Sequence, residues 1–121
     1  MRAEEISSPS RKIKYGLSRT YDFLKLCNNP EETFFSIQII GTNGKGTVAA
    51  FVSQILIDAG YNVGTYSSPH LIQINERVKI NNKCIHDNDI NYFLNKYYKK
   101  ANEIQPSFFE LMTTMSMWYF Y

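Results

Sequence analysis

An apolar run, a glycine-rich turn and an amphipathic stretch follow one another between residues 34 and 67, and this order constrains the fold more than any other feature of the chain. Residues 34–40 (FFSIQII) are nearly all apolar and precede a glycine, the pattern of a strand buried on both faces. From Val48 to Ala59 apolar residues recur at helical spacing, and Gly60 stands where a helix-ending glycine is expected. Residues 62–67 (NVGTYS) read as a second strand. The segment therefore predicts a strand–helix–strand crossover with parallel strands, which is an α/β arrangement.

Three further helices and a hairpin are predicted outside this unit. Apolar residues at helical spacing predict a helix over 17–27 and another from about Asn88, with Asp87 as its N-cap. A last helix is expected from Ser107, because residues 107–110 (SFFE) have the S-x-x-E form of a capping box. The Asn81-Asn82 pair predicts a hairpin turn, since asparagine tolerates positive φ.

Composition excludes several classes of protein. The 121 residues suffice for one domain, and a net charge of only +2 argues against a nucleic-acid-binding surface. Cys27 and Cys84 stand alone, which favours a reducing cytoplasm over a disulfide scaffold or a zinc site. The charged first 19 residues are no secretory signal, and the apolar stretch 111–121 is shorter than the roughly 20 residues of a membrane helix. Because that stretch meets the chain end uncapped, we expect a segment of a longer protein. A monomer is the expected oligomeric state.

The glycine-rich turn between the first strand and its helix is the predicted functional site. Glycines let the backbone bend tightly and aim its N–H groups at an anion, and the positive end of the helix dipole adds to their effect. Lys45 contributes a full positive charge, and the hydroxyl of Thr47 is a suitable ligand for the Mg²⁺ that accompanies a triphosphate. The predicted phosphate site comprises Gly41, Thr42, Asn43, Gly44, Lys45, Gly46 and Thr47.

Two known nucleotide-binding patterns bear on the interpretation of this turn. The general P-loop pattern G-x-x-x-x-G-K-[ST] fails, because only two residues separate Gly41 from Gly44-Lys45 and a glycine stands between Lys45 and Thr47. Residues 44–49 (GKGTVA) satisfy the dinucleotide pattern G-x-G-x-x-G/A, which would predict an oxidoreductase domain. That alternative expects an acidic residue after the second strand, where the sequence has Ser67-Ser68. A turn that only connects two elements leaves Lys45 unexplained.

Four motifs in order now resemble one family. The sequence resembles folylpolyglutamate synthase and bifunctional dihydrofolate synthase of the Mur ligase superfamily. The similar segments are the turn 41–47, residues 59–64 (AGYNVG), residues 67–78 with Ser67-Ser68-Pro69-His70-Leu71 and Asn75-Glu76-Arg77-Val78, and Ser107–Glu110. The resemblance implies part of a three-layer P-loop NTPase-like fold with parallel strands. Residues 13–121 would be the amino-terminal part of the ATPase domain, after a loose segment 1–12.

The activity that this resemblance implies is ATP- and Mg²⁺-dependent addition of L-glutamate to folate or dihydropteroate through an acyl phosphate. Lys45 would act catalytically at the β/γ-phosphates, Thr47 and Ser68 would face the metal, and no role is assigned to His70, Glu76 or Arg77. The pterin-binding residues implied by the family are Ile13, Lys14, Tyr15, Ser107, Phe108, Phe109 and Glu110.

The sequence departs from the family pattern at one position near the expected folate site, and other functions were also compared with it. Ser18 stands where relatives usually have an acidic residue before the arginine matched by Arg19, which concerns the entrance to the folate site. A peptidoglycan-precursor ligase is the nearest rival, but those enzymes generally have serine or threonine at the position of Gly46 and lack the S-S-P-H loop. An adaptor role is a third class. The family's second metal carboxylate, its carbamylated lysine and its glutamate-binding domain are missing from these 121 residues. We therefore expect the 121 residues alone not to catalyse the ligase reaction.

Overall fold

The computed structural model of the chain describes residues 16–121 and divides into two compact units. One unit joins the residues up to Phe34 with Asp87–Tyr121, and the other is Phe35–His86. The predicted loose segment 1–12 and the predicted pterin-binding residues 13–15 lie outside the described residues.

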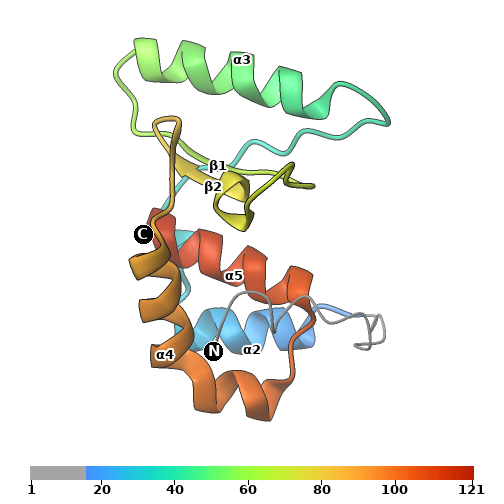
Figure 1. Cartoon of the computed structure of the whole chain (residues 1–121), viewed down its shortest axis with the longest axis vertical. Coiled ribbons are helices and arrows are strands. Elements are labelled where there is room, and N and C mark those ends of the chain that lie inside the picture. The colour runs from blue at the N-terminus through green and yellow to red at the C-terminus, as the bar shows by residue number, and fades with distance from the viewer. Residues whose placement is uncertain (1–15) are drawn as a thin grey trace. The chain divides into compact units, whose positions relative to one another are not determined.

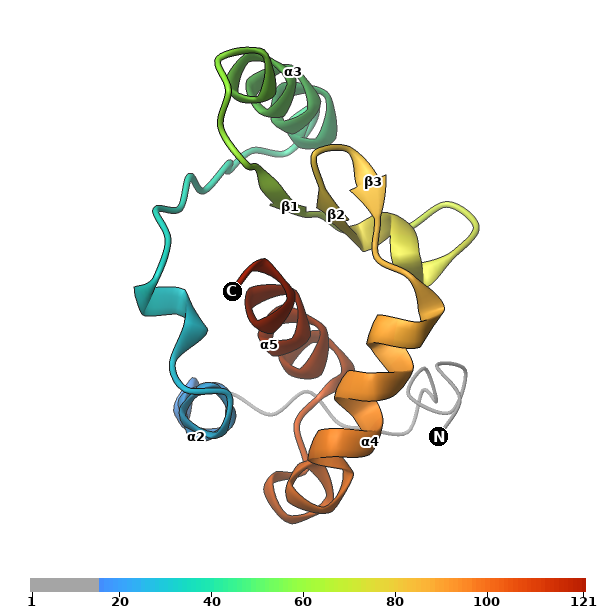
Figure 2. The ribbon, with the colours of Figure 1, turned by 90° about the vertical axis from the view of Figure 1, so that its left-hand side faces the viewer.

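The first unit is helical. It consists of α2 (Ser18–Leu26), the short 3-10 helix η1 (Pro30–Glu32), α4 (Asp87–Ile104) and α5 (Phe108–Phe120). Figures 1 and 2 show α2, α4 and α5 side by side, and all three pairs of helices are in contact. The predicted helices over 17–27 and from Ser107 are confirmed. Asp87 is the first residue of α4 rather than its N-cap, a difference of one position that is common at helix ends.

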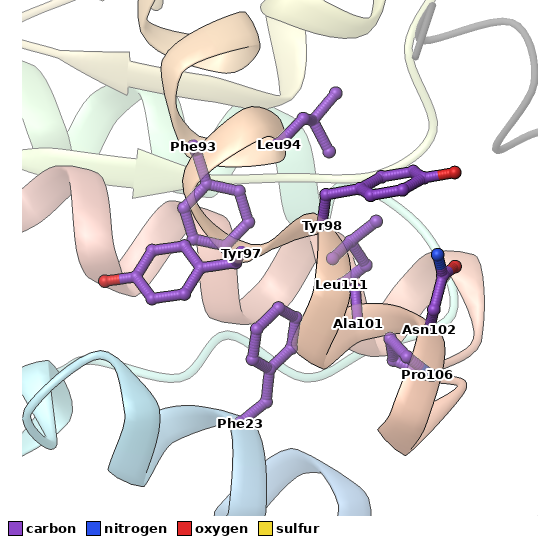
Figure 3. Close-up of a pocket in the computed structure, with 9 residues that line it drawn as sticks. All are labelled: Phe23, Phe93, Leu94, Tyr97, Tyr98, Ala101, Asn102, Pro106 and Leu111. Atoms are coloured by element: carbon purple, nitrogen blue, oxygen red, sulfur yellow. The ribbon is translucent and has the colours of Figure 1, made fainter.

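An aromatic cluster forms the core of this helical unit. The ring of Phe93 lies 4.9 Å from that of Tyr97, 5.1 Å from that of Trp118 and 5.9 Å from that of Phe23, measured between centroids. Phe23 and Phe93 are completely buried. Figure 3 shows Phe23 directed from α2 toward the rings of Phe93 and Tyr97 on α4. The small groove beside them has room for little more than a water molecule, so it is a packing defect of the core rather than a ligand site.

The second unit contains α3 (Lys45–Asp58), β1 (Gly64–Tyr66), the 3-10 helix η2 (Ile74–Arg77), β2 (Val78–Ile80) and β3 (Lys83–Cys84). The three strands form an antiparallel sheet in the order β1-β2-β3, with Tyr66 opposite Val78 and Ile80 opposite Lys83. Asn81 and Asn82 have φ values of 49° and 63°, which confirms the predicted hairpin turn. Figure 2 shows α3 beyond the tip of this hairpin.

The side chains of the hairpin turn connect it to its neighbours. Asn81 Oδ1 accepts a hydrogen bond of 2.9 Å from the Val63 amide, just before β1. Asn82 Nδ2 donates to Gln54 Oε1 of α3 at 3.0 Å. The two asparagines therefore supply the left-handed backbone of the turn and also fasten β1 and α3 to it.

The predicted strand over 34–40 is wrong for this structure, since none of these residues is assigned to a strand. Phe35 is fully exposed, and Ile40 is 83% exposed. The apolar face of α3 is uncovered as well, with Phe51 and Ile55 each 67% exposed. A buried strand needs neighbouring strands for its N–H and C=O groups and a layer on each face. Within residues 16–121 the sheet has only antiparallel pairs, so the predicted parallel pairing with residues 62–67 is not confirmed.

The end of α3 follows the prediction. Gly60 has a φ of 89°, and its amide donates to the Ile57 carbonyl at 2.9 Å while the Tyr61 amide donates to the Leu56 carbonyl at 3.0 Å. This pair of bonds is the Schellman arrangement, in which a residue of left-handed conformation satisfies the last carbonyls of a helix. Glycine is favoured there because its lack of a Cβ atom removes the steric cost of positive φ.

Candidate functional site

The glycine-rich turn is shaped by the backbone of Gly44 and leads directly into α3. Gly44 is the N-cap residue and adopts a left-handed conformation with a φ of 75°. The helix begins at Lys45, three residues before the predicted Val48. Lys45 and Thr47 thus belong to the first turn of α3, so their backbone amides lie at the positive end of its dipole.

Lys45 folds back over the turn that precedes it. Its Nζ atom donates to the carbonyl oxygen of Gly41 at 2.6 Å and lies 3.5 Å from that of Thr42. A cation in the first turn of a helix is electrostatically unfavourable, and α3 has no acidic residue there to offset it. The ammonium group and the helix dipole therefore leave a positive, exposed region that an anion would neutralise.

The amides of this turn are available to a ligand. Along the chain, Val48 is the first residue of α3 whose amide has a backbone partner, the Gly44 carbonyl at 3.0 Å. Among residues 16–121, no hydrogen bond is formed by the amides of Gly44, Lys45, Gly46 or Thr47. The first amides of a helix have no partner within it, and several of them together form a site where an anion can accept hydrogen bonds.

Ser68, the other predicted metal ligand, lies in an exposed loop of the same unit. The loop is held by Glu76, to which the sequence assigned no role. Its carboxylate accepts hydrogen bonds from the amides of Leu71, Ile72 and Gln73, at 2.8, 3.0 and 2.9 Å. The hydrogen bond from Gln73 and then that from Leu71 lower the pKa of Glu76, so its carboxylate form is stabilised.

Arg77 holds the other part of the loop. Its Nε atom donates to Nδ1 of His70 at 2.7 Å, and its carbonyl accepts from the Ser67 amide at 2.9 Å. The sequence assigned no role to His70 and Arg77 because nothing in their spacing requires a contact across the loop. The only sign in the sequence that His70 and Arg77 act on this loop was that they belong to the same motif as Ser68.

The hydroxyls of Thr47 and Ser68 are hard, neutral oxygen donors, which suit Mg²⁺. Among residues 16–121, no group of three or more His, Cys, Asp or Glu side chains gathers to hold a metal ion. Magnesium commonly keeps several waters and takes its remaining ligands from one or two carboxylates and from substrate phosphates. These two residues therefore fit part of a nucleotide-bound Mg²⁺ site, and their assignment stays a prediction.

The predicted pterin-binding segment 107–110 forms the start of α5 in the helical unit. Ser107 Oγ accepts from the Glu110 amide at 3.2 Å, and Glu110 Oε2 accepts from the Ser107 amide at 2.6 Å, which confirms the capping box. Phe109 is 56% exposed, and Phe108 is partly exposed. Binding of a pterin by these residues stays a prediction.

Glu110 also pairs with Arg19 of α2. Two guanidinium nitrogens of Arg19 donate to the two carboxylate oxygens of Glu110, at 2.9 and 3.3 Å. Burial raises the pKa of Glu110, but the hydrogen bonds from Ser107 and Arg19 and the charge of Arg19 outweigh it, so the pKa lies below its ordinary value of 4.5. Arg19, which the family resemblance predicts to lie near the entrance to the folate site, therefore joins α2 to the start of α5.

The Arg19–Glu110 pair predicts a pH-dependent stability. Because the folded-state pKa of Glu110 is depressed, its contribution is fully present above the ordinary value of 4.5 and is lost as pH falls through the folded-state value. Glu110→Gln should cost about 1–2 kcal/mol of unfolding free energy at pH 7 and progressively less below pH 4.5. Denaturant unfolding of both proteins from pH 7 to pH 3 measures this difference.

Glu103→Gln is the matched control, because Glu103 makes an exposed pair with Lys100 and should change stability by less than about 0.5 kcal/mol at either pH. A Glu110→Gln variant whose deficit does not change between pH 7 and pH 3 would contradict the assigned role of the carboxylate charge.

No helix among the described residues 16–121 has the length and apolar character that crossing a membrane requires.

Comparison with known proteins gives a consistent set of relatives. No family model matches the chain. The dihydrofolate synthase/folylpolyglutamate synthase of Bacillus subtilis strain 168 is 34% identical over 114 residues, which are 89% of this chain and 26% of the relative. The chain therefore spans about a quarter of the length of this relative and of the dihydrofolate synthetase of Saccharomyces cerevisiae.

Solved structures agree with the sequence relatives. Folylpolyglutamate synthase from Thermotoga maritima is 41% identical with a TM-score of 0.84 and is covered over 27% of its length by 90% of this chain. Escherichia coli FolC in complex with DHPP and ADP is 29% identical with a TM-score of 0.86. The match covers 98% of this chain and 29% of FolC. The bifunctional synthase from Yersinia pestis complexed with AMPPNP and Mn ion is 30% identical with a TM-score of 0.81. The match covers 94% of this chain and 28% of that synthase.

These likenesses extend over almost the whole chain and favour neither the dinucleotide-binding nor the peptidoglycan-precursor alternative. The mixed helix and sheet structure resembles that of the solved synthases. Over the quarter of their length that it spans, the chain belongs to the family of folylpolyglutamate synthases and dihydrofolate synthases.

Proposed function

We propose that this chain is the nucleotide-binding part of an ATP-dependent ligase that adds L-glutamate to a folate or to dihydropteroate. The observation that carries the proposal is the turn before α3, where four amides have no partner among the described residues and the exposed ammonium group of Lys45 folds back onto the Gly41 carbonyl. The relatives are named for this activity, and the solved relatives include complexes with ADP and with AMPPNP. The peptidoglycan-precursor ligase shares this ATP chemistry but lacks comparable support.

In the proposed reaction, a carboxylate oxygen of the pteroate or folate attacks the γ-phosphorus of ATP, and the bond from that phosphorus to the β-phosphate oxygen breaks to leave ADP. The amine of glutamate then attacks the acyl carbon, the bond from carbon to phosphate oxygen breaks, and the nitrogen loses a proton. An amide and inorganic phosphate result. The protein contributes positioning and charge stabilisation in both steps.

Within this scheme the turn residues Gly41–Thr47 hold the phosphates. The amides of Gly44 and Gly46 donate to phosphate oxygens, and Lys45 moves from the Gly41 carbonyl to the β/γ oxygens, where it stabilises the charge of the transferring group. Mg²⁺ would neutralise phosphate charge and is assigned to the hydroxyls of Thr47 and Ser68. The manganese in the Yersinia pestis synthase complex supports a divalent ion in such a site.

The remaining parts of the proposal concern folding and substrate binding. Residues 34–40 are proposed to be a strand of a parallel, three-layer P-loop-like sheet in the complete protein, where α3 would cover its apolar side chains. Residues 13–15 and 107–110 are proposed to line the pterin site, which is supported by the DHPP held by Escherichia coli FolC. A cytoplasmic monomer is the proposed setting.

Release of phosphate tests the proposed function. The complete protein should release phosphate from ATP only when Mg²⁺, glutamate and either dihydropteroate or a reduced folate are all present, because the acyl phosphate forms only on a bound carboxylate. A coupled phosphate assay that omits one component at a time measures this, and comparison of the two pteridine substrates identifies which glutamate is added. Tight NAD(H) binding without Mg²⁺-ATP binding would overturn the proposal in favour of an oxidoreductase domain.

A further inference from the structure

The loop that carries Ser68 is attached at both ends to the same two consecutive residues. At its start, the Ser67 amide donates to the Arg77 carbonyl at 2.9 Å, immediately after the pairing of Tyr66 with Val78 in the sheet. At its end, the amides of residues 71–73 donate to the Glu76 carboxylate. Only the short span 68–70 lies between these attachments.

The Glu76 side chain does more than cap the short helix η2. A capping box requires one hydrogen bond donated by the N-cap amide, here that of Gln73, to the carboxylate. Two further bonds, from the Leu71 amide to Oε2 and from the Ile72 amide to Oε1, lie outside that arrangement. A carboxylate can accept all three bonds because both oxygens are acceptors, whereas an amide side chain has a single oxygen.

A tether inside the span itself adds to these attachments. His70 Nδ1 accepts from the Arg77 guanidinium at 2.7 Å, so the imidazole two residues after Ser68 is held as well. A neutral serine hydroxyl is a weak metal ligand, and its contribution depends on being held at the right place before the metal binds.

We infer that Glu76 is a positioning residue for metal binding: by gathering three loop amides, its carboxylate fixes the loop 67–73 so that the Ser68 hydroxyl is held ready for the nucleotide-bound metal. This inference rests on the proposed function, since it requires Ser68 to face a divalent ion. Glu76 itself touches neither the metal nor the substrate in this assignment.

Hydrogen exchange tests the attachment directly. In the protein without ligand, Glu76→Ala should speed exchange of the Leu71, Ile72 and Gln73 amides by roughly tenfold, because each loses an acceptor that is charged. Glu76→Gln should have a smaller effect, since its single oxygen can still accept from two amides, and it keeps the test valid where the alanine variant fails to fold. Unchanged exchange in both variants would overturn the inference.

Metal dependence tests the positioning role in the complete protein. Both variants should raise the Mg²⁺ concentration for half-maximal phosphate release, by roughly tenfold for alanine, and should weaken binding of Mn²⁺ with AMPPNP measured by electron paramagnetic resonance. A role confined to folding would lower the amount of active protein and leave the metal dependence unchanged, and that result overturns the inference.

Glu103→Gln is the control for the metal measurements, because its exposed partner Lys100 lies on α4 in the helical unit, and it should match the wild type. Failure of the proposed function gives a different result from failure of the inference. A wild-type protein that binds no Mn²⁺ and AMPPNP overturns both, whereas a wild type that binds them and variants that bind equally well overturn the role of Glu76 alone.

Discussion

Replacing Lys45 by alanine is expected to lower phosphate release by the complete protein by at least about 100-fold under saturating substrates. The ammonium group lies over the glycine-rich turn, at the positive end of α3, and has no acidic residue in that turn to pair with it. Its role in the proposed reaction is to stabilise charge on the transferring phosphoryl group. Such an interaction is strongest in the transition state, so the loss should appear mainly in kcat.

Lys99→Ala is the matched control, since this lysine is exposed on α4 and belongs to the helical unit. Steady-state phosphate release with both variants, together with their unfolding midpoints, separates a chemical effect from a folding effect. Lys45→Ala should unfold at nearly the same denaturant concentration as the wild type, because its hydrogen bond to Gly41 is exposed. Activity equal to that of the wild type in a folded Lys45→Ala variant would contradict the proposed phosphate site.

Replacing Phe93 by alanine should destabilise the helical unit by about 3–5 kcal/mol, the largest expected effect on stability. Its ring is completely buried and lies within 6 Å of three aromatic rings, those of Phe23, Tyr97 and Trp118. Removing it deletes apolar contacts and the favourable ring pairings, and it leaves a cavity that helices α2, α4 and α5 cannot fill without moving. Denaturant unfolding followed by Trp118 fluorescence measures the change.

Tyr98→Ala provides the comparison on the same helix, because the Tyr98 side chain is 48% exposed and its truncation opens no closed cavity. It should cost markedly less than Phe93→Ala. Similar losses for the two variants would show that the unfolding free energy does not depend on the aromatic core as described.

Local patterns predicted the local parts of this structure. The S-x-x-E pattern predicted the capping box at Ser107, the asparagine pair predicted the turn between β2 and β3, and Gly60 predicted the end of α3. Each depends on interactions within a few residues, so the sequence of a short window contains the necessary information.

The parts that were not predicted depend on distant partners. The apolar run 34–40 has the composition of a buried strand, but burial requires strands and layers supplied by other residues, and composition does not say whether they are present. The bonds from the loop 67–73 to Glu76 and Arg77 were missed because they arise from how a turn folds back, which has no periodicity. The glycine-rich turn was placed correctly before a helix, while its ligand stays a prediction.

The exposed run from Phe35 to Ile40 also bears on how a protein containing this segment reaches its native state. Until another layer covers it, this run offers unpaired backbone groups and large apolar side chains to any similar segment nearby. Nascent chains that wait for that cover are therefore open to mispairing with one another at this point. Rapid docking of the covering layer, or a chaperone that shields the run, would decide how much of the protein avoids aggregation during synthesis.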